Sequence, residues 1–358
     1  MISKFAVIGA LICALGAPTS AEALTKVRVA WCSKTLNISV APFAIATKMG
    51  WFKEGGIEVE IVSFGGSTEC IQNLAIGEVD FSHSTAEPLA VVRGRGVKGK
   101  VFYTILHKNI FGLAVPADSP IQSIADLKGK TVGVTSMAST GVLIARAIVA
   151  TNGLDPDNDF KLAAIGEAGQ SAALIRSKQV DALSQFATQY ALVEYAGIKL
   201  RRLDNSAVAN FPSNGLATLE ATLKSKRKEA IALARGFAMG TLFANENPEA
   251  ATRIMYEVYP ESRPMGRDEA TLIAIDKLVI DSVRFSQDVP ALGIAQWGLS
   301  DVKAYGDYLK FLKRWAVIKD DIAAEDFVSN ELIDDANKFD AAEVVKAAKA
   351  YGTRQGDR

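Results

Sequence analysis

A repeated unit of strand, polar loop and helix start constrains this sequence most. Residues 57–64 alternate apolar and polar side chains, as a half-buried strand does, and Gly65 and Gly66 then allow the chain to turn. Ser67 and Thr68 follow, and both residue types cap helices. The stretch therefore predicts a strand that leads into an exposed helix N-terminus, where backbone N–H groups can hold an anionic or carbonyl group.

The unit recurs along the chain. Residues 131–135 form a second such strand, and a loop rich in Ser and Thr leads from it into a helix over 142–151. This alternation predicts an α/β fold with mostly parallel sheets, whose ligand crevice lies at the carboxyl ends of the strands. Two isolated strands, 112–115 and 215–219, interrupt the alternation, and we interpret them as crossovers between two lobes. Beyond residue 222 the pattern becomes helical.

Composition narrows the functional class. The 358 residues are 49% hydrophobic, enough to bury the cores of two domains, and 40 basic residues balance 40 acidic ones. With zero net charge and no long basic run, the sequence gives no electrostatic basis for binding nucleic acid or an anionic membrane. We therefore expect no nucleic-acid partner.

The first 23 residues predict a secretory signal peptide. Lys4 precedes an apolar run over 5–17, and Ala21 and Ala23 are small residues where signal peptidase cleaves, although the cleavage site itself stays open. The run is too short to span a bilayer comfortably. We therefore expect a periplasmic protein, in which Cys32 and Cys70 form either a disulfide or two free buried thiols.

Other motifs do not indicate catalysis. Gly94, Gly96 and Gly99 follow a predicted helix, which is the wrong context for dinucleotide binding. The aspartates at 155, 157 and 159 start a calcium-loop spacing that the following residues do not complete. With only two histidines and no nucleophile motif, we expect no catalytic residue, metal or cofactor.

Several short motifs carry a family resemblance over residues 27–204: Gly50-Trp51-Phe52-Lys53, Gly56-Ile57-Glu58-Val59, Leu74-Ala75-Ile76-Gly77-Glu78-Val79-Asp80-Phe81, Asp126-Leu127-Lys128-Gly129-Lys130-Thr131-Val132 and Gln179-Val180-Asp181-Ala182. The chain resembles the periplasmic substrate-binding proteins of nitrate, taurine and alkanesulfonate ABC importers. Their superfamily also contains thiamine-precursor synthases.

The resemblance implies a type II periplasmic-binding-protein fold. One lobe would comprise residues 24–111 and 215–358, and the other residues 112–214. It also implies a monomer that closes its lobes over a small organic solute (a sulfonate, carboxylate, aromatic or heterocyclic compound) and delivers it to a permease in the inner membrane. The alternative is an enzyme on the same fold, such as a thiamine-pyrimidine or menaquinone-pathway enzyme.

Mapped onto matching positions, the resemblance implies a set of ligand-binding residues on the loops that face the cleft: Trp31, Lys34, Gly66, Ser67, Thr68, His83, Ser84, Thr85, Ser136, Ser139, Thr140, Gln170, Gln185, Phe186 and Thr188. At Gln185-Phe186 many relatives carry tryptophan followed by proline, so the ligand class stays open.

Each of these residues also has a structural interpretation. The hydroxyl residues can be helix caps, and Ser84 with Glu87 fits a capping box. Trp31, Phe186 and Tyr190 can stack on a planar ligand or fill the core. His83 can donate to a ligand or serve as a structural histidine.

Overall fold

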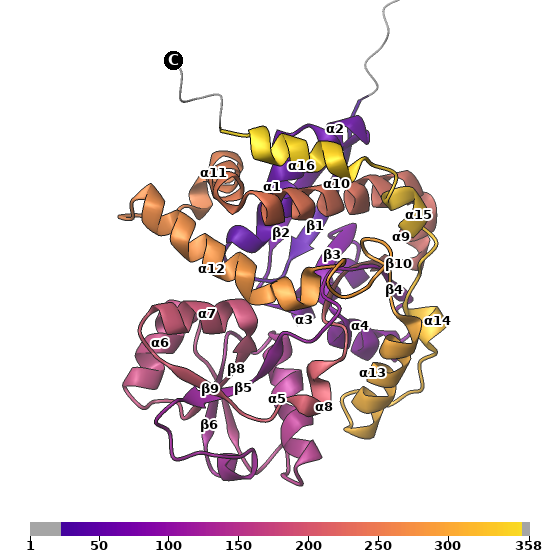
Figure 1. The fold of residues 1–358 in the computed structure, drawn as a ribbon. Coiled ribbons are helices and arrows are strands. Elements are labelled where there is room, and N and C mark those ends of the chain that lie inside the picture. The colour runs from indigo at the N-terminus through magenta and orange to yellow at the C-terminus, as the bar shows by residue number, and fades with distance from the viewer. Residues whose placement is uncertain (1–22, 353–358) are drawn as a thin grey trace, which may run out of the picture.

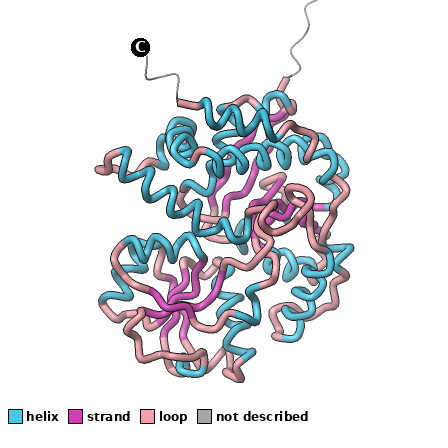
Figure 2. The backbone as a smooth tube through the Cα atoms, viewed as in Figure 1, coloured by secondary structure: helices cyan, strands magenta, loops and turns pink. Residues whose placement is uncertain are grey.

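Two five-stranded sheets organise the chain in the computed structural model, which describes residues 23–352 (Figure 1). The predicted signal peptide lies outside the described residues except for its last position. Helices surround both groups of strands, and loops connect the two halves where they face each other (Figure 2). The α/β architecture predicted from the alternation is therefore present.

The first sheet has the strand order β2-β1-β3-β10-β4. Strands β1, β2 and β3 run parallel, with Val27 opposite Val59, whereas β10 is antiparallel to both of its neighbours. The strands are β1 (Thr25–Trp31), β2 (Ile57–Ser63), β3 (Phe81–Thr85), β4 (Gly99–Thr104) and β10 (Asn214–Leu219).

The second sheet repeats this plan in the order β7-β6-β8-β5-β9. Here β6 is parallel to β7 and β8, and β5 is antiparallel to β8 and β9. The strands are β5 (Phe111–Pro116), β6 (Thr131–Val134), β7 (Lys161–Ala164), β8 (Ala182–Phe186) and β9 (Leu200–Arg202).

The two strands that interrupt the alternation of the sequence, β5 and β10, are thus the one reversed strand of each sheet. Each is the first strand after the chain passes from one sheet to the other. The lobe boundaries at residues 112 and 215 stay a prediction, because sheet membership does not define which residues move together.

Helices cover the outer faces of the sheets. Those between the strands are α1 (Ala41–Lys48), α2 (Trp51–Glu54), α3 (Ser67–Ala75), α4 (Ala86–Arg93), α5 (Thr140–Thr151), α6 (Ala168–Arg176), α7 (Ala187–Tyr195) and α8 (Ser206–Ala209). Those after β10 are α9 (Glu220–Ser225), α10 (Arg227–Glu246), α11 (Pro248–Val258), α12 (Glu269–Gln287), α13 (Val302–Arg314), α14 (Ala324–Phe327), α15 (Ile333–Ala336) and α16 (Ala341–Ala350).

The C-terminal helices pack mainly on the first sheet. Helix α10 lies against α1 so closely that a Cβ on Gly240 would come 2.1 Å from the carbonyl oxygen of Pro42. Phe43 and Phe237 meet edge to face in the core between them, with ring centroids 4.8 Å apart. Helix α12 instead reaches across to α7 beside the second sheet (Figure 1). No helix among residues 23–352 has the length and apolar content to span a membrane.

The predicted capping box is wrong. Thr85, not Ser84, is the N-cap residue of α4, and no side chain caps its backbone. The side chain of Glu87 is instead buried and accepts a hydrogen bond from the hydroxyl of Tyr308 on α13. Burial raises the pKa of this carboxyl. A tertiary contact therefore replaces the local one that the sequence suggested.

Candidate functional site

A cavity of about 400 Å³ lies between the two sheets. Trp31 at the end of β1 and His83 on β3 line it from the first sheet, and Phe186 at the end of β8 and Thr135 after β6 line it from the second. It therefore occupies the carboxyl ends of the parallel strands, where an α/β fold places its ligand crevice.

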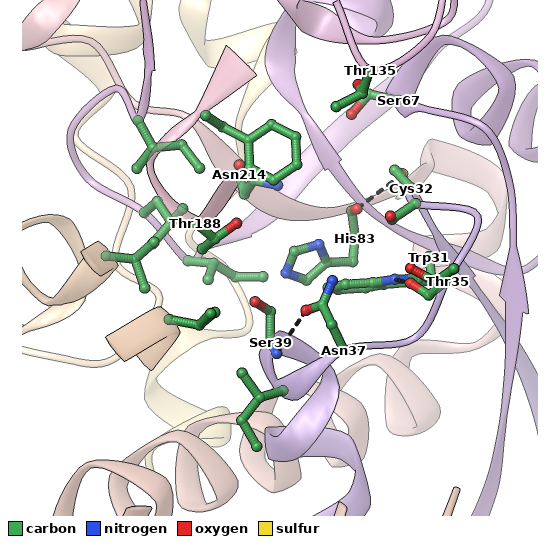
Figure 3. A pocket seen from close by; sticks show the side chains of 18 of the residues that line it. Trp31, Cys32, Thr35, Asn37, Ser39, Ser67, His83, Thr135, Thr188 and Asn214 are labelled. Atoms are coloured by element: carbon green, nitrogen blue, oxygen red, sulfur yellow. Dashed lines mark hydrogen bonds between the residues drawn. The ribbon is translucent and has the colours of Figure 1, made fainter. Parts of the chain in front are cut away.

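Most of the residues that the resemblance implied for the site lie in the cavity wall. They are Trp31, Lys34, Gly66, Ser67, His83, Ser136, Ser139, Thr140, Gln170, Phe186 and Thr188. Figure 3 shows the His83 ring among the side chains of Asn37, Ser39, Thr188 and Asn214. Whether each residue contacts a ligand stays a prediction.

Three hydroxyl residues of that set do not line the cavity. The backbone N–H of Thr68 donates to the carbonyl oxygen of Ala138, across the gap between the halves, at 3.1 Å. Ser84 is buried in β3, and its Oγ has no hydrogen-bond partner among the described residues. Thr85 Oγ1 lies 2.6 Å from Thr140 Oγ1, so this pair joins the two halves. Thr68 and Thr85 thus join the two halves beside the cavity, and Ser84 is a buried residue of the first sheet.

Gln185 also lies outside the cavity wall. Its side chain is fully buried within the second half, and its Nε2 donates to Ser171 Oγ at 2.7 Å. The backbone N–H of Gln185 donates to the hydroxyl of Tyr190, which in turn donates to Gly112 O at 2.6 Å. Tyr190 is therefore a core residue. Of the Gln185-Phe186 pair, only Phe186 is positioned to influence ligand choice.

At three helix starts around the cavity, one of the N–H groups that the sequence predicted to be free already has a protein acceptor. At α3, Thr68 N–H has the Ala138 carbonyl as its partner, and no side chain caps the helix. At α5, Gly141 N–H donates to Ser139 Oγ at 3.1 Å. At α6, Ala168 N–H donates to Gln189 Oε1 at 2.7 Å. Protein oxygens thus take up one N–H donor at each of these helix starts, which leaves fewer donors for an anion.

His83 forms part of an aromatic wall. Its ring lies 4.9 Å from that of Trp31 and 6.0 Å from that of Phe237, measured between centroids. Burial lowers the pKa of His83 from 6.5 to about 4. At neutral pH the ring is therefore uncharged, and it offers one N–H donor and one lone pair.

A carboxylate joins the two halves at the edge of the cavity. Glu167, just before α6, accepts hydrogen bonds from Ser33 Oγ at 2.5 Å and from Thr35 Oγ1 at 2.6 Å. Trp31 Nε1 donates to the backbone oxygen of Thr35 at 3.1 Å, so the same loop carries a cavity side chain. We call this loop, residues 31–37, together with Glu167 the latch.

A disulfide links Cys32 of this loop to Cys70 on α3, with Cα atoms 5.8 Å apart. Of the two states that the sequence left open, the structure has the bonded one. Cys32 Sγ also lies 3.0 Å from the carbonyl oxygen of His83. The disulfide therefore fixes the loop to α3, and the loop lies close to β3 at this side of the cavity.

The sequence did not identify the cavity residues on the C-terminal helices. Phe237, Thr241 and Asn245 on α10 and Val283 and Gln287 on α12 close the cavity on one side. Their helical periodicity marks them only as the buried face of an amphipathic helix, so no local signal separates a cavity wall from core. Within residues 23–352, no cluster of three or more His, Cys, Asp or Glu is placed to hold a metal ion.

Comparisons with known proteins agree on the fold. The chain is 23% identical over 250 residues to the riboflavin-binding protein RibY of Chloroflexus aurantiacus, which covers 69% of this chain and 70% of that protein. The alkanesulfonate-binding protein SsuA of Xanthomonas axonopodis pv. citri, solved with bound MOPS, superposes with a TM-score of 0.65 at 13% identity, over 86% of this chain and 99% of that one.

The periplasmic nitrate-binding protein NrtA of Synechocystis PCC 6803 gives a TM-score of 0.62 at 15% identity, over 90% of this chain and 89% of that one. At such identities the likeness shows the fold, which is the two-lobed fold of periplasmic binding proteins. The family model described as NMT1/THI5 like matches residues 37–251, which is more than half of the chain. The protein therefore belongs to the NMT1/THI5-like family.

Proposed function

We propose that this protein is the extracytoplasmic solute receptor of an ABC importer. It closes its two halves over a small organic solute and delivers that solute to the permease. The observation that carries the proposal is the cavity of about 400 Å³, lined by residues of both halves at the carboxyl ends of both sheets. The binding-protein fold of its structural neighbours supports it further.

A thermal-shift screen of the purified protein tests binding. The panel contains riboflavin, pyrimidines, aromatic amides and acids, aliphatic sulfonates and nitrate. We expect saturable stabilisation by one chemical class, amounting to about 2.7 kcal/mol at a hundredfold excess over Kd. A chain that no panel member stabilises, and that carries no solute in native mass spectrometry after purification, would contradict the proposed function.

Export is part of this proposal. N-terminal sequencing of the protein recovered from a periplasmic fraction should show a mature chain that begins close to residue 24. A protein that stays in the cytoplasm with Met1 retained would argue against a receptor for an importer.

The alternative is an enzyme on this fold, and the bonding state of Cys32 is evidence about that alternative. Cys32 lines the cavity, but its sulfur is bonded to Cys70 and is not a thiolate nucleophile in that state. The proposal therefore predicts that bound compounds are recovered unchanged. Mass spectrometry of each screening hit, after incubation with and without dithiothreitol, separates the two functions, because turnover in either condition would support an enzyme.

A further inference from the structure

We propose that the cavity takes an uncharged, planar ring compound and discriminates against oxoanions. This inference rests on the proposed function, since it names the chemical class of solute that the same site binds.

The charges of the cavity wall do not favour an anion. Among the described residues that line it, Lys34 and Glu167 have charged side chains, whereas the buried His83 is uncharged at neutral pH. Lys34 is exposed, where water screens its charge. Glu167 adds a negative charge on the opposite half. An oxoanion buried here would leave water without gaining a desolvated cation.

The helix starts around the cavity offer an oxoanion fewer backbone donors than their number suggests. A protein can hold an oxoanion on helix N-termini, but one N–H donor at the start of each of α3, α5 and α6 already binds a protein oxygen: Ala138 O, Ser139 Oγ and Gln189 Oε1 respectively. In addition, a Cβ on Gly66 would come 2.5 Å from Ala138 O, so the α3 start is packed against the other half. No room for an anion is left between Gly66 and the backbone of Ala138.

Aromatic rings face the cavity from both halves. Trp31, His83 and Phe237 contribute from the first half, with the centroid distances given above. Phe111 and Phe186 form a pair on the side of the second sheet, with centroids 5.3 Å apart. All five line the cavity. A planar ring held between these two groups gains apolar burial and stacking or edge contacts.

The polar groups of the wall suit a neutral ligand. Asn37 Oδ1 accepts from Ser39 N–H at 3.0 Å, and Asn214 Oδ1 accepts from Ser213 Oγ at 3.1 Å. Neither NH₂ group has an acceptor among residues 23–352, so each is left for an acceptor on a ligand. Both side chains lie around the His83 ring in Figure 3. A ring carbonyl or ring nitrogen matches such donors without bringing a charge into the cavity.

Matched ligands that differ only in charge test this inference. Isothermal titration calorimetry of the purified mature protein would compare 2-naphthamide with 2-naphthoate and naphthalene-2-sulfonate, and nicotinamide with nicotinate. We expect the neutral member of at least one series to bind, and to bind at least about tenfold more tightly than its anions. Tighter binding of the carboxylate or sulfonate, or no binding by any ring compound, would overturn the inference.

A pair of phenylalanine variants tests the aromatic wall. F186L should weaken binding of the neutral ring ligand by about three- to tenfold, because it removes a ring edge or face but keeps most of the volume. F285L is the matched control, since Phe285 is 52% exposed and does not line the cavity. Equal affinities of the wild type and F186L would contradict a stacked ring. Circular dichroism confirms that both variants fold.

The outcomes also separate this inference from the proposed function. If an aliphatic sulfonate or nitrate binds saturably in the wider screen while the ring compounds do not, the receptor function stands and the ligand class is wrong. If no compound binds and no solute copurifies, the receptor function itself fails.

Discussion

Gly66 shows how a single residue can control the approach of the two halves. The backbone of Ala138 occupies the space where any other residue would place its Cβ, at 2.5 Å from the carbonyl oxygen. We therefore predict that G66A holds the halves apart and lowers the affinity for solute at least tenfold, with little change in the stability of either half. Isothermal titration measures the affinity, and thermal unfolding measures the stability.

Gly169 provides the matched control for this substitution. A Cβ at this position on α6 would meet no atom within 4 Å. G169A should bind solute as the wild type does. If G66A and G169A have the same affinity, the close approach at Ala138 does not matter for binding.

His83 predicts a loss of stability in acid. Its pKa is about 4 in the folded protein, below the ordinary 6.5, so between these values the unfolded chain binds more protons. The contribution of His83 is complete above pH 6.5 and falls as the pH decreases towards 4. At pH 5 the difference amounts to about 2 kcal/mol for a shift of this size.

Urea unfolding of the ligand-free protein at pH 8 and pH 5 measures this effect. The decrease in the free energy of unfolding between the two pH values should be about 2 kcal/mol smaller in H83Q than in the wild type, because glutamine does not titrate. Equal decreases in both proteins would mean that His83 is not held neutral.

At the scale of elements, the latch connects the loop after β1 to the start of α6. Two hydroxyls donate to the Glu167 carboxylate, and hydrogen bonds to a charged group contribute more than neutral ones. We predict that E167A weakens solute binding by about tenfold, mainly through faster dissociation.

Stopped-flow measurement of solute association and dissociation tests the latch. E58A is the control, because Glu58 is an exposed carboxylate on β2 that does not line the cavity. S33A should weaken solute binding by part of the E167A effect. The double variant S33A/E167A should bind solute no more weakly than E167A does. Full additivity of the two substitutions would show that the residues do not act together.

The disulfide ties the same loop to α3. It closes a loop of 38 residues, for which the chain-entropy model gives a stabilisation of about 3–4 kcal/mol. Urea unfolding with and without dithiothreitol should show that reduction lowers the free energy of unfolding by about 2–4 kcal/mol. The C32S/C70S variant should be as stable as the reduced protein, and dithiothreitol should not change its stability. A wild type that is equally stable in both conditions would show that the bond does not contribute.

The sequence predicted those elements whose signals are local. Strand β2 alternates apolar and polar side chains over residues 57–61, and α3 follows a glycine pair, so both appear near the predicted positions. The partners of polar side chains were harder to predict. Glu87 binds Tyr308, which lies 221 residues away, and Gln185 turns into the second half, because a strand-end side chain can face either way.

At the scale of the whole molecule, the sequence predicted the cavity at the strand ends but not its full wall. Alternation of strand and helix is enough to place a crevice there. Helices α10 and α12 close this cavity because of the way the C-terminal helices pack. Helical periodicity does not predict that packing, since it does not specify the partner of an apolar face. The acceptors of the helix N–H groups were only partly predictable, since Ser139 caps its own helix but Ala138 O and Gln189 Oε1 come from other segments.

The proposed receptor function requires that one solute binds per chain inside this cavity. The most direct measurement is isothermal titration of the best screening hit into the wild type and into T188W, in which an indole fills part of the cavity that Thr188 lines. We expect a stoichiometry of one for the wild type and loss of binding in T188W, with unchanged circular dichroism. Unchanged affinity in a folded T188W variant would contradict it.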